Sequence, residues 1–230
     1  MSHFFPIPQH ISFNEGINSY LFELNDLSQT KILISTIAPG AELKMHAHPE
    51  YQMGMALKGS FSIQIDGKEE SLEELSNAYA IPPNVVHSAI NRSGKVAISL
   101  DIKRKHCEET FPEKQDYFIY PENERTLRTG INMRFFLSSW CEVMLSTIPQ
   151  YASMPTHKHC GEQIGIAVQG NYFMQVGGEE EQFHFGKIYY APDEVTHGAY
   201  NPFAETAISL NLFLPHRYNK PRKYQREYKS

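Results

Sequence analysis

Cysteine is scarce in this sequence of 230 residues, and long apolar runs are missing. The three cysteines, Cys107, Cys141 and Cys160, form no Cys-x-x-Cys pair, so we expect neither a disulfide framework nor a zinc knuckle. No uninterrupted apolar run approaches the ~18 residues that a membrane span requires, and no basic segment precedes an apolar stretch near Met1. We therefore expect a cytoplasmic protein without a membrane partner.

Charge of one sign is not in large excess either. The 21 Lys and Arg residues and the 26 Asp and Glu residues give a formal net charge of −5, which argues against a general role at nucleic acids or membrane surfaces. The local exception is the C-terminal tail, residues 217–229, in which basic residues are interleaved with tyrosines. Terminal segments of this kind are usually solvated, so we predict no nucleic-acid partner.

Helical periodicity is nearly absent, and residues 71–79 are the one short candidate. Elsewhere, short segments alternate between apolar and polar residues. Residues 61–65 alternate in this way and run into Asp66-Gly67, and residues 172–176 run into Gly177-Gly178. Both dipeptides favour two-residue hairpin turns between antiparallel strands. The sequence therefore predicts an all-β fold.

One histidine pattern occurs twice: His-x-His-x-x-x-Gln with a single histidine downstream. The first set is His46, His48, Gln52 and His87, and the second set is His157, His159, Gln163 and His197. Other segments recur in the same register, such as Ala-Ile-Ser-Leu at 97–100 and 207–210. A repeat of about 110 residues has the size of a small domain. We therefore predict two domains, residues 1–110 and residues 111–230, the second ending in the basic tail, with a polar linker at 103–116.

Each set is predicted to hold one metal ion. Residues i and i+2 of a strand point to the same face, so His46 and His48 can aim both imidazoles at one ion, and Gln52 shares their parity. His87 then has to come from another strand, which a closed barrel allows. The five histidines without a repeat partner are expected to be ordinary surface or core residues: His3, His10, His106, His184 and His216.

The ligand set also indicates which ion and which substrate would fit. Imidazole ligands suit transition metals better than magnesium or calcium, so we expect divalent iron or cobalt, with nickel, zinc, manganese or copper as alternatives. Three imidazoles and a carboxamide are neutral, so the ion keeps its full charge and favours an anionic substrate. A six-coordinate ion would keep two positions open, enough for a 2-oxo acid to chelate. The weak fourth donor favours a working site over a closed structural zinc site.

The two sets belong to longer motifs. In each half, His-x-His-x-x-x-Gln is followed by Gly-x-x-x-x-Gly and then by Pro-x-x-x-x-His, which resembles both motifs of the cupin superfamily, with Gln where most cupins carry Glu. The resemblance implies two tandem cupin barrels, also called double-stranded β-helix or jelly-roll barrels. Residues 154–159, 162–165 and 215–219 further resemble the bicupin isomerases of bacilysin biosynthesis. This closer resemblance covers residues 116–219 well and the first half less well.

The resemblance implies an activity and residue roles. Members of this family isomerise a dihydro-hydroxyphenylpyruvate, a 2-oxo acid whose ring double bond moves by enolisation and reprotonation. The metal ligands would be the two sets of four residues, and Tyr218 would contact the substrate. Because a nearby dication lowers the pKa of a tyrosine, we also predict that Tyr218 carries the proton. Arg217, Lys103 or Arg104 can bind the carboxylate. Since Tyr218 follows the last strand of the second barrel and its repeat position in the first half falls in the linker, we expect the second site to be catalytic.

Other functions fit the same motifs. A metal-dependent bicupin dioxygenase of the quercetinase type is the alternative enzyme, although such enzymes commonly use Glu as the fourth ligand. A non-enzymatic bicupin that senses or stores a small molecule is a second alternative, and a duplicated barrel with vestigial sites is a third. The protein is expected to be a monomer or a homodimer.

Overall fold

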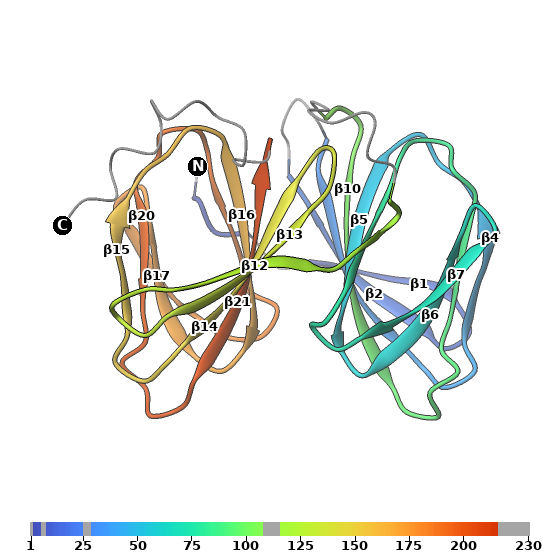
Figure 1. Cartoon of the computed structure of the whole chain (residues 1–230), viewed down its shortest axis with the longest axis horizontal. Helices are drawn as coiled ribbons and strands as arrows, with labels where there is room; N and C mark the ends of the chain where they lie inside the picture. Colours follow the sequence, from blue (N-terminus) through green and yellow to red (C-terminus); the bar gives the residue numbers. More distant parts are fainter. Residues whose placement is uncertain (1, 6–7, 25–28, 108–115, 216–230) are drawn as a thin grey trace. The chain divides into compact units, whose positions relative to one another are not determined.

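The computed structural model describes residues 2–5, 8–24, 29–107 and 116–215, and in these ranges the regular structure consists of antiparallel β-strands (Figure 1). The all-β prediction is confirmed. No helix in the described ranges is long and apolar enough to cross a membrane. The described residues include all three cysteines, and none of them forms a disulfide, as the sequence predicts.

The chain forms two compact units. The N-terminal unit contains the described residues 8–24, 29–107 and 116–120, and it has two sheets. The larger sheet has the strand order β1 (Gln9–Asn14), β2 (Ile17–Glu23), β3 (Lys31–Ile37), β10 (Ala97–Arg104), β5 (Tyr51–Lys58), β8 (Ala78–Ile81) and β11 (Phe118–Ile119). The smaller sheet has the order β4 (Glu42–His46), β9 (His87–Ile90), β6 (Ser60–Ile65) and β7 (Lys68–Glu73).

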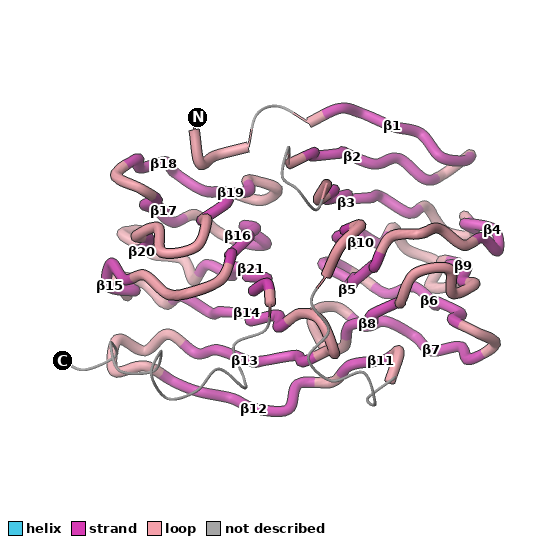
Figure 2. Tube along the Cα trace, turned by 90° about the horizontal axis from the view of Figure 1, so that it is seen from above, coloured by secondary structure: helices cyan, strands magenta, loops and turns pink. Residues whose placement is uncertain are grey.

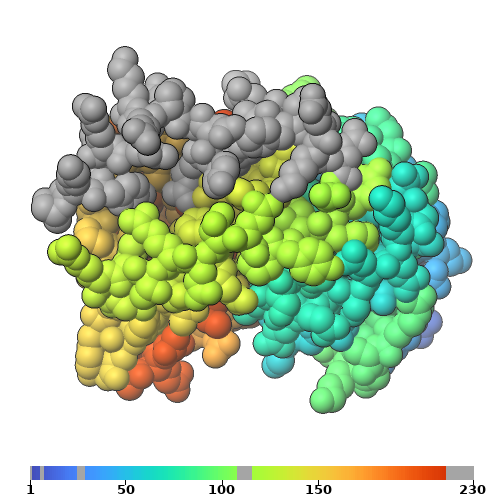
Figure 3. Space-filling view, in the orientation of Figure 1, coloured from blue at the N-terminus to red at the C-terminus, as the bar shows by residue number. Residues whose placement is uncertain are grey.

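The C-terminal unit contains residues 2–5 and 121–215 and repeats this arrangement. Its larger sheet has the order β12 (Pro121–Thr126), β13 (Asn132–Leu137), β14 (Glu142–Ile148), β21 (Ala207–Leu214), β16 (Glu162–Gln169) and β19 (Ile188–Ala191). Its smaller sheet has the order β15 (Ser153–His157), β20 (His197–Tyr200), β17 (Tyr172–Val176) and β18 (Glu179–Phe183). The residues of the edge strand β12 are exposed, and they lie at the molecular surface in Figure 3.

Each unit has its own apolar core between its two sheets. In β6, Phe61, Ile63 and Ile65 are buried and alternate with partly exposed residues, which is the period of a strand with one face in a core. In β17, Tyr172, Met174 and Val176 alternate in the same way. This alternation, which the sequence shows directly, decides which side chains turn inward.

Both predicted hairpins are present. Asp66 and Gly67 have φ angles of 48° and 79° and join β6 to β7, while Gly177 and Gly178, with φ of 58° and 88°, join β17 to β18. The segment with helical periodicity, residues 71–79, contains the end of β7 and the start of β8 instead of a helix. Leu72 and Ala78 in it are buried strand residues, because sheet pairing on both sides outweighs a short helical pattern.

Two short segments outside the repeated strands pair with the edges of the larger sheets. In the C-terminal unit, Phe4 forms a bridge with Tyr189 of β19, beside which the N-terminal segment lies in Figure 2. In the N-terminal unit, Phe118 of β11 pairs with Tyr79 of β8. The predicted linker began at residue 103, but β10 continues to Arg104 because it pairs with β5 as far as Tyr51. The central part of that linker lies outside the described residues.

Candidate metal centres

The first ligand set comes together at one end of the N-terminal barrel. His46 ends β4, Gln52 lies in β5 and His87 begins β9. A register shift in the β4–β9 pairing places His46 opposite His87, and their ring centroids are 4.3 Å apart. The ligand nitrogens of the three histidines lie within 4.8 Å of one another, which suits a single ion.

The prediction that both histidines of each His-x-His motif lie on a strand is wrong for the second histidine. His48 lies in the connection after β4, and His159 lies in the connection after β15. The pairing with β9 and β20 ends at His46 and His157, so the chain leaves the sheet before the second histidine. The connection, not the alternation of a strand, therefore turns the second imidazole toward the first.

The second ligand set has nearly the same geometry. His157 ends β15, Gln163 lies in β16 and His197 begins β20, again after a register shift that pairs His157 with His197. The ring centroids of this histidine pair are 4.5 Å apart, and the ligand nitrogens of the three histidines lie within 4.8 Å of one another. The duplicated sequence has therefore folded into duplicated sites.

Contacts on the far side of the rings orient the imidazoles. The Nδ1 atom of His87 lies 2.8 Å from the Val85 carbonyl oxygen, and that of His46 lies 2.9 Å from the Lys44 carbonyl oxygen. The corresponding contacts of the second set are His157 Nδ1 to Pro155 O, 2.9 Å, and His197 Nδ1 to Val195 O, 2.9 Å. An Nδ1–H that donates to a carbonyl leaves the Nε2 lone pair for a metal, as in most protein metal sites.

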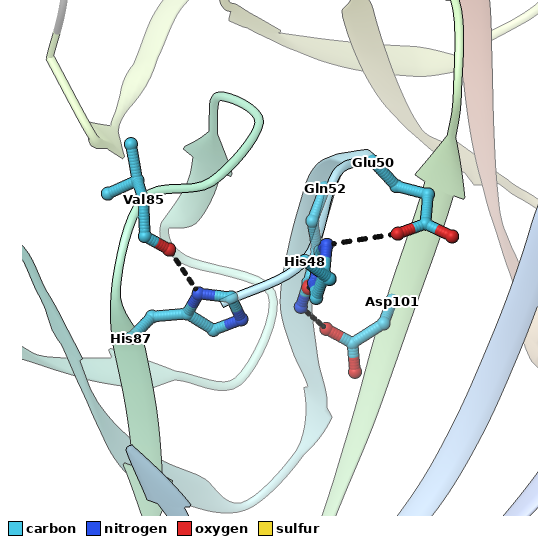
Figure 4. Close-up of polar contacts among 6 residues, drawn as sticks. All are labelled: His48, Glu50, Gln52, Val85, His87 and Asp101. Atoms are coloured by element: carbon cyan, nitrogen blue, oxygen red, sulfur yellow. Dashed lines mark hydrogen bonds and ion pairs between the residues drawn. The ribbon is translucent and has the colours of Figure 1, made fainter. Parts of the chain in front are cut away.

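The carboxamide of Gln52 is held in place by the hydrogen bonds that its amide nitrogen donates (Figure 4). Its amide nitrogen donates to Asp101 Oδ1 at 2.7 Å and to the Tyr79 hydroxyl at 3.1 Å. The remaining atom, Oε1, lies 2.7 Å from Nε2 of His48. Because both amide hydrogens point away from the histidines, the oxygen faces the site and can act as the fourth ligand.

Gln163 is held in the same way in the second set. Its amide nitrogen donates to the Tyr189 hydroxyl and, at 3.1 Å, to Asn211 Oδ1, while its Oε1 lies 2.9 Å from Nε2 of His159. The residues that hold the two glutamines, Tyr79 with Asp101 and Tyr189 with Asn211, were not predicted from the sequence. A signal was present, because Tyr189 and Asn211 each follow their counterparts, Tyr79 and Asp101, by 110 residues.

Burial keeps two histidines of the first set, His48 and His87, in the neutral form that can bind a metal. Burial lowers the pKa of His87 from its usual 6.5 to about 4, although the hydrogen bond that its ring donates to the Val85 carbonyl raises it. Burial and then the charge of Lys103 lower the pKa of His48. Both imidazoles are therefore neutral near pH 7, which is the form that binds a metal.

The donors present fit a divalent transition metal. Nε2 of His87 is buried, and no described residue donates a hydrogen bond to it or accepts one from it. A buried lone pair of this kind costs free energy unless something occupies it. A cation at the point where the Nε2 atoms of His46, His48 and His87 converge would satisfy it, with Gln52 Oε1 as the fourth donor.

A cavity of about 1090 Å³ lies in the C-terminal barrel and includes the second ligand set. Apolar side chains form much of its wall, among them Phe135, Met144 and Phe213, and Arg125 and Arg128 also line it. The cavity is large enough for a small organic acid with a ring. Its lining also contains His157, His159, Gln163 and His197.

The structure thus brings together the three histidines and the glutamine of each predicted set. That these residues bind metal stays a prediction. Tyr218 and Arg217, predicted to contact the substrate, lie outside the described residues, as does His216. Lys103, a predicted carboxylate ligand, is two residues after Asp101 on β10 and close enough to His48 and His87 to lower their pKa values.

The Cupin domain family matches residues 33–103 and 144–213, one segment in each unit and together more than half of the chain. The protein therefore belongs to the cupin family, and with two cupin domains it is a bicupin, as predicted. An H2HPP isomerase from Bacillus subtilis is 36% identical to it over 218 residues, which are 94% of this chain and 91% of that protein.

Solved structures agree with this assignment. AerE from Microcystis aeruginosa superposes with a TM-score of 0.84 at 28% identity, covering 93% of this chain and 99% of that chain. A variant of oxalate decarboxylase from Bacillus subtilis superposes with a TM-score of 0.70 at 14% identity, covering 91% of this chain and 76% of that chain. The second likeness shows that the two proteins share the bicupin fold.

Proposed function

We propose that the protein is a metal-dependent isomerase that moves a ring double bond in a dihydro-hydroxyphenylpyruvate-type 2-oxo acid, in the biosynthesis of a bacilysin-like dipeptide antibiotic. The observation that carries the proposal is the 36% identity with an H2HPP isomerase over nearly the whole chain. The cytoplasmic location and the choice of iron or cobalt stay predictions from the sequence.

The cavity of the C-terminal barrel supports this substrate class. Phe135, Met144 and Phe213 offer apolar surface to a six-membered ring and exclude water from it. Arg125 and Arg128 supply the positive charge toward which a carboxylate turns. The cavity thus offers apolar surface for a ring and positive charge for a carboxylate, which are the two parts of an aromatic-like 2-oxo acid.

The histidines and Gln163 would hold the 2-oxo end of the substrate in place. When bound by these four residues, a divalent transition metal supplies a Lewis acid, which acidifies the protons beside a 2-oxo group. The apolar wall of the cavity strengthens the charge interactions at that end, because water does not screen them there. The protein then has to remove one proton and return one at a distant ring carbon.

Tyr218 is the residue that we propose for this proton transfer. It lies three residues after Pro215, with which the described part of the C-terminal unit ends. A tyrosine beside a dication has a lowered pKa and can exchange a proton near neutral pH. The role rests on the resemblance of residues 215–219 to the bacilysin isomerases, and Arg217 is proposed as a further contact for the carboxylate.

Ultraviolet absorbance tests the activity directly. Metal-loaded protein is incubated with the decarboxylated product of prephenate, and the absorbance of the conjugated dienone is followed over time. We expect the absorbance to grow without oxygen consumption. An unchanged spectrum with fully loaded protein would reject the isomerase, and oxygen uptake would favour a dioxygenase.

Two matched ligand variants test which barrel is catalytic. His159→Ala and His48→Ala remove equivalent ligands from the two sets, and metal analysis verifies that each loses one ion. We expect His159→Ala to lose far more activity than His48→Ala, and Tyr218→Phe to keep both ions but turn over about 10²- to 10⁴-fold more slowly. Full activity in His159→Ala would move catalysis out of the C-terminal barrel.

A further inference from the structure

The two ligand sets are alike, but the residues behind their glutamines differ in charge. Asp101 of β10 accepts a hydrogen bond from Gln52 in the N-terminal unit, and Asn211 of β21 accepts one from Gln163 in the C-terminal unit. The two positions are 110 residues apart and correspond in the repeat. One metal site thus has a carboxylate in direct contact with a ligand, where the other has a neutral amide.

Asp101 only accepts hydrogen bonds. Its Oδ1 receives them from the Gln52 amide at 2.7 Å and from the Tyr79 hydroxyl, and its Oδ2 receives one from the Ser99 hydroxyl at 3.3 Å. A carboxylate has no proton to donate, so it can accept hydrogen bonds from all three groups at once. The group therefore presents a negative charge to the amide that it orients (Figure 4).

Asn211 makes the same set of contacts without the charge. Its Oδ1 accepts from Gln163 at 3.1 Å and from the Tyr189 hydroxyl at 2.8 Å. Its Nδ2 donates to the Ser209 hydroxyl at 3.2 Å, so the serine accepts here, where Ser99 of the other unit donates. Asn211 shows that an asparagine fits this network of hydrogen bonds. Substituting asparagine for Asp101, or aspartate for Asn211, therefore changes the charge of the side chain with little change in its shape.

The surroundings add further charge to the first site. Glu50 contacts Nδ1 of His48 at 3.4 Å, and Lys103 is the nearby cation whose charge lowers the pKa of His48 after the larger effect of burial. The corresponding residues of the second site, Gly161 and Phe213, are uncharged, although Glu142 lines the cavity there and Glu194 is close enough to His159 to interact with it electrostatically. A carboxylate hydrogen-bonded to a ligand makes that ligand a better donor and attracts the cation as well.

We propose that Asp101 is a positioning residue that makes the N-terminal site bind a divalent transition metal more tightly than the C-terminal site. The proposal rests on the proposed metal binding of both sets, but not on the isomerase activity. Partners of metal ligands typically change metal affinity by about 10- to 100-fold. The N-terminal ion is then retained under conditions in which the C-terminal ion, beside the cavity, exchanges.

The test is a titration of the metal-free full-length protein with Co²⁺ alone, in competition with a chromophoric chelator. We expect two affinity classes in the unaltered protein, about 10- to 100-fold apart. Asp101→Asn should weaken the tighter class by that factor, and Asn211→Asp should strengthen the weaker class. Loss of the tighter class in His46→Ala, but not in His157→Ala, assigns it to the N-terminal site.

A control and a spectroscopic readout separate the effect from simple damage to the fold. Asp66→Asn removes the same charge from the hairpin turn between β6 and β7, where asparagine is tolerated, and should leave both classes unchanged. The visible absorbance of the first equivalent of Co²⁺ should change in Asp101→Asn, because the donor strength of Gln52 changes, while the metal-free melting temperature stays close to that of the unaltered protein.

Asp101→Asn and Asn211→Asp leave the other nearby charges, Glu50, Lys103 and Glu142, unchanged. A change in metal affinity can therefore be attributed to the substituted residue. Equal affinities at the two sites, or an Asp101→Asn variant with the same affinity and Co²⁺ spectrum as the unaltered protein, would overturn the proposal. A protein that binds no Co²⁺ at all would reject the metal sites themselves, while a protein that binds two ions but leaves the 2-oxo acid unchanged would reject only the isomerase.

Discussion

The ring of Tyr189 lies directly against the backbone of Gly165, so that a Cβ atom on that glycine would stand 1.9 Å from the ring atom Cε1. Gly54 and Tyr79 have the same relation in the other unit, where a Cβ would stand 2.3 Å from the hydroxyl oxygen. The missing side chain lets the tyrosine cross the neighbouring strand and reach the glutamine with its hydroxyl. The Gln-x-Gly sequence in each repeat is therefore part of the candidate metal site.

Gly165→Ala should consequently damage the second site and spare the first. The added methyl group has to push the Tyr189 ring aside, which costs about 1 to 3 kcal/mol in a packed core and removes one of the two hydrogen bonds that orient Gln163. We expect a lower midpoint in urea and loss of Co²⁺ binding at the C-terminal site, the weaker of the two affinity classes, measured by titration of the metal-free protein. The N-terminal site is the internal control, and two fully occupied sites in this variant would contradict the account.

The convergence of the candidate ligands and the hairpins could be predicted because their signals are local. The spacing of His46, His48 and Gln52 and its recurrence later in the chain are visible without coordinates, as are the turn residues Asp66 and Gly67. Periodicity also gave the inward faces of β6 and β17, since alternation is the direct signature of a strand beside a core.

The residues behind the ligands could not be found in this way. Asp101 meets Gln52 only because β10 pairs with β5, and Tyr79 joins them because β8 pairs with the other edge of β5. Strand neighbours of this kind depend on the topology of the whole barrel. The position of His48 was misjudged for a related reason, since the end of the β4 pairing at His46 is set by a register shift with β9.

Changing each glutamine to glutamate should have unequal effects in the two barrels. In Gln52→Glu a second carboxylate would face Asp101 at hydrogen-bonding distance, and the two like charges repel unless they share a proton. In Gln163→Glu the partner is Asn211, whose amide can turn to donate. We expect the metal-free Gln52→Glu variant to melt at a lower temperature than Gln163→Glu. Equal melting temperatures would argue against repulsion between the side chains at positions 52 and 101.

The stability of the metal-free protein should fall on acidification. His87 has a pKa of about 4 when folded, because it is buried, and about 6.5 when unfolded. Between these values the unfolded chain binds a proton that the native state does not, so unfolding becomes more favourable as the pH falls from about 6.5 to about 4, and this residue has no effect above that window. Urea midpoints measured from pH 7.5 to 4.5 test this. In His87→Gln the decline should be shallower, and an identical decline would assign it to other groups.

The apolar wall of the cavity should determine how tightly the substrate ring binds. Phe135 lines the cavity and is only partly buried where it packs against the core, so Phe135→Ala removes contact surface for the ring. Loss of about half of a buried aromatic contact corresponds to roughly a tenfold rise in KM, with kcat and metal content nearly unchanged. Phe185, 45% exposed and away from the cavity lining, provides the matched control in Phe185→Ala. Steady-state kinetics on the 2-oxo acid distinguish the outcomes: an unchanged KM in Phe135→Ala would place the ring elsewhere, and an equal rise in both variants would point to a general loss of stability.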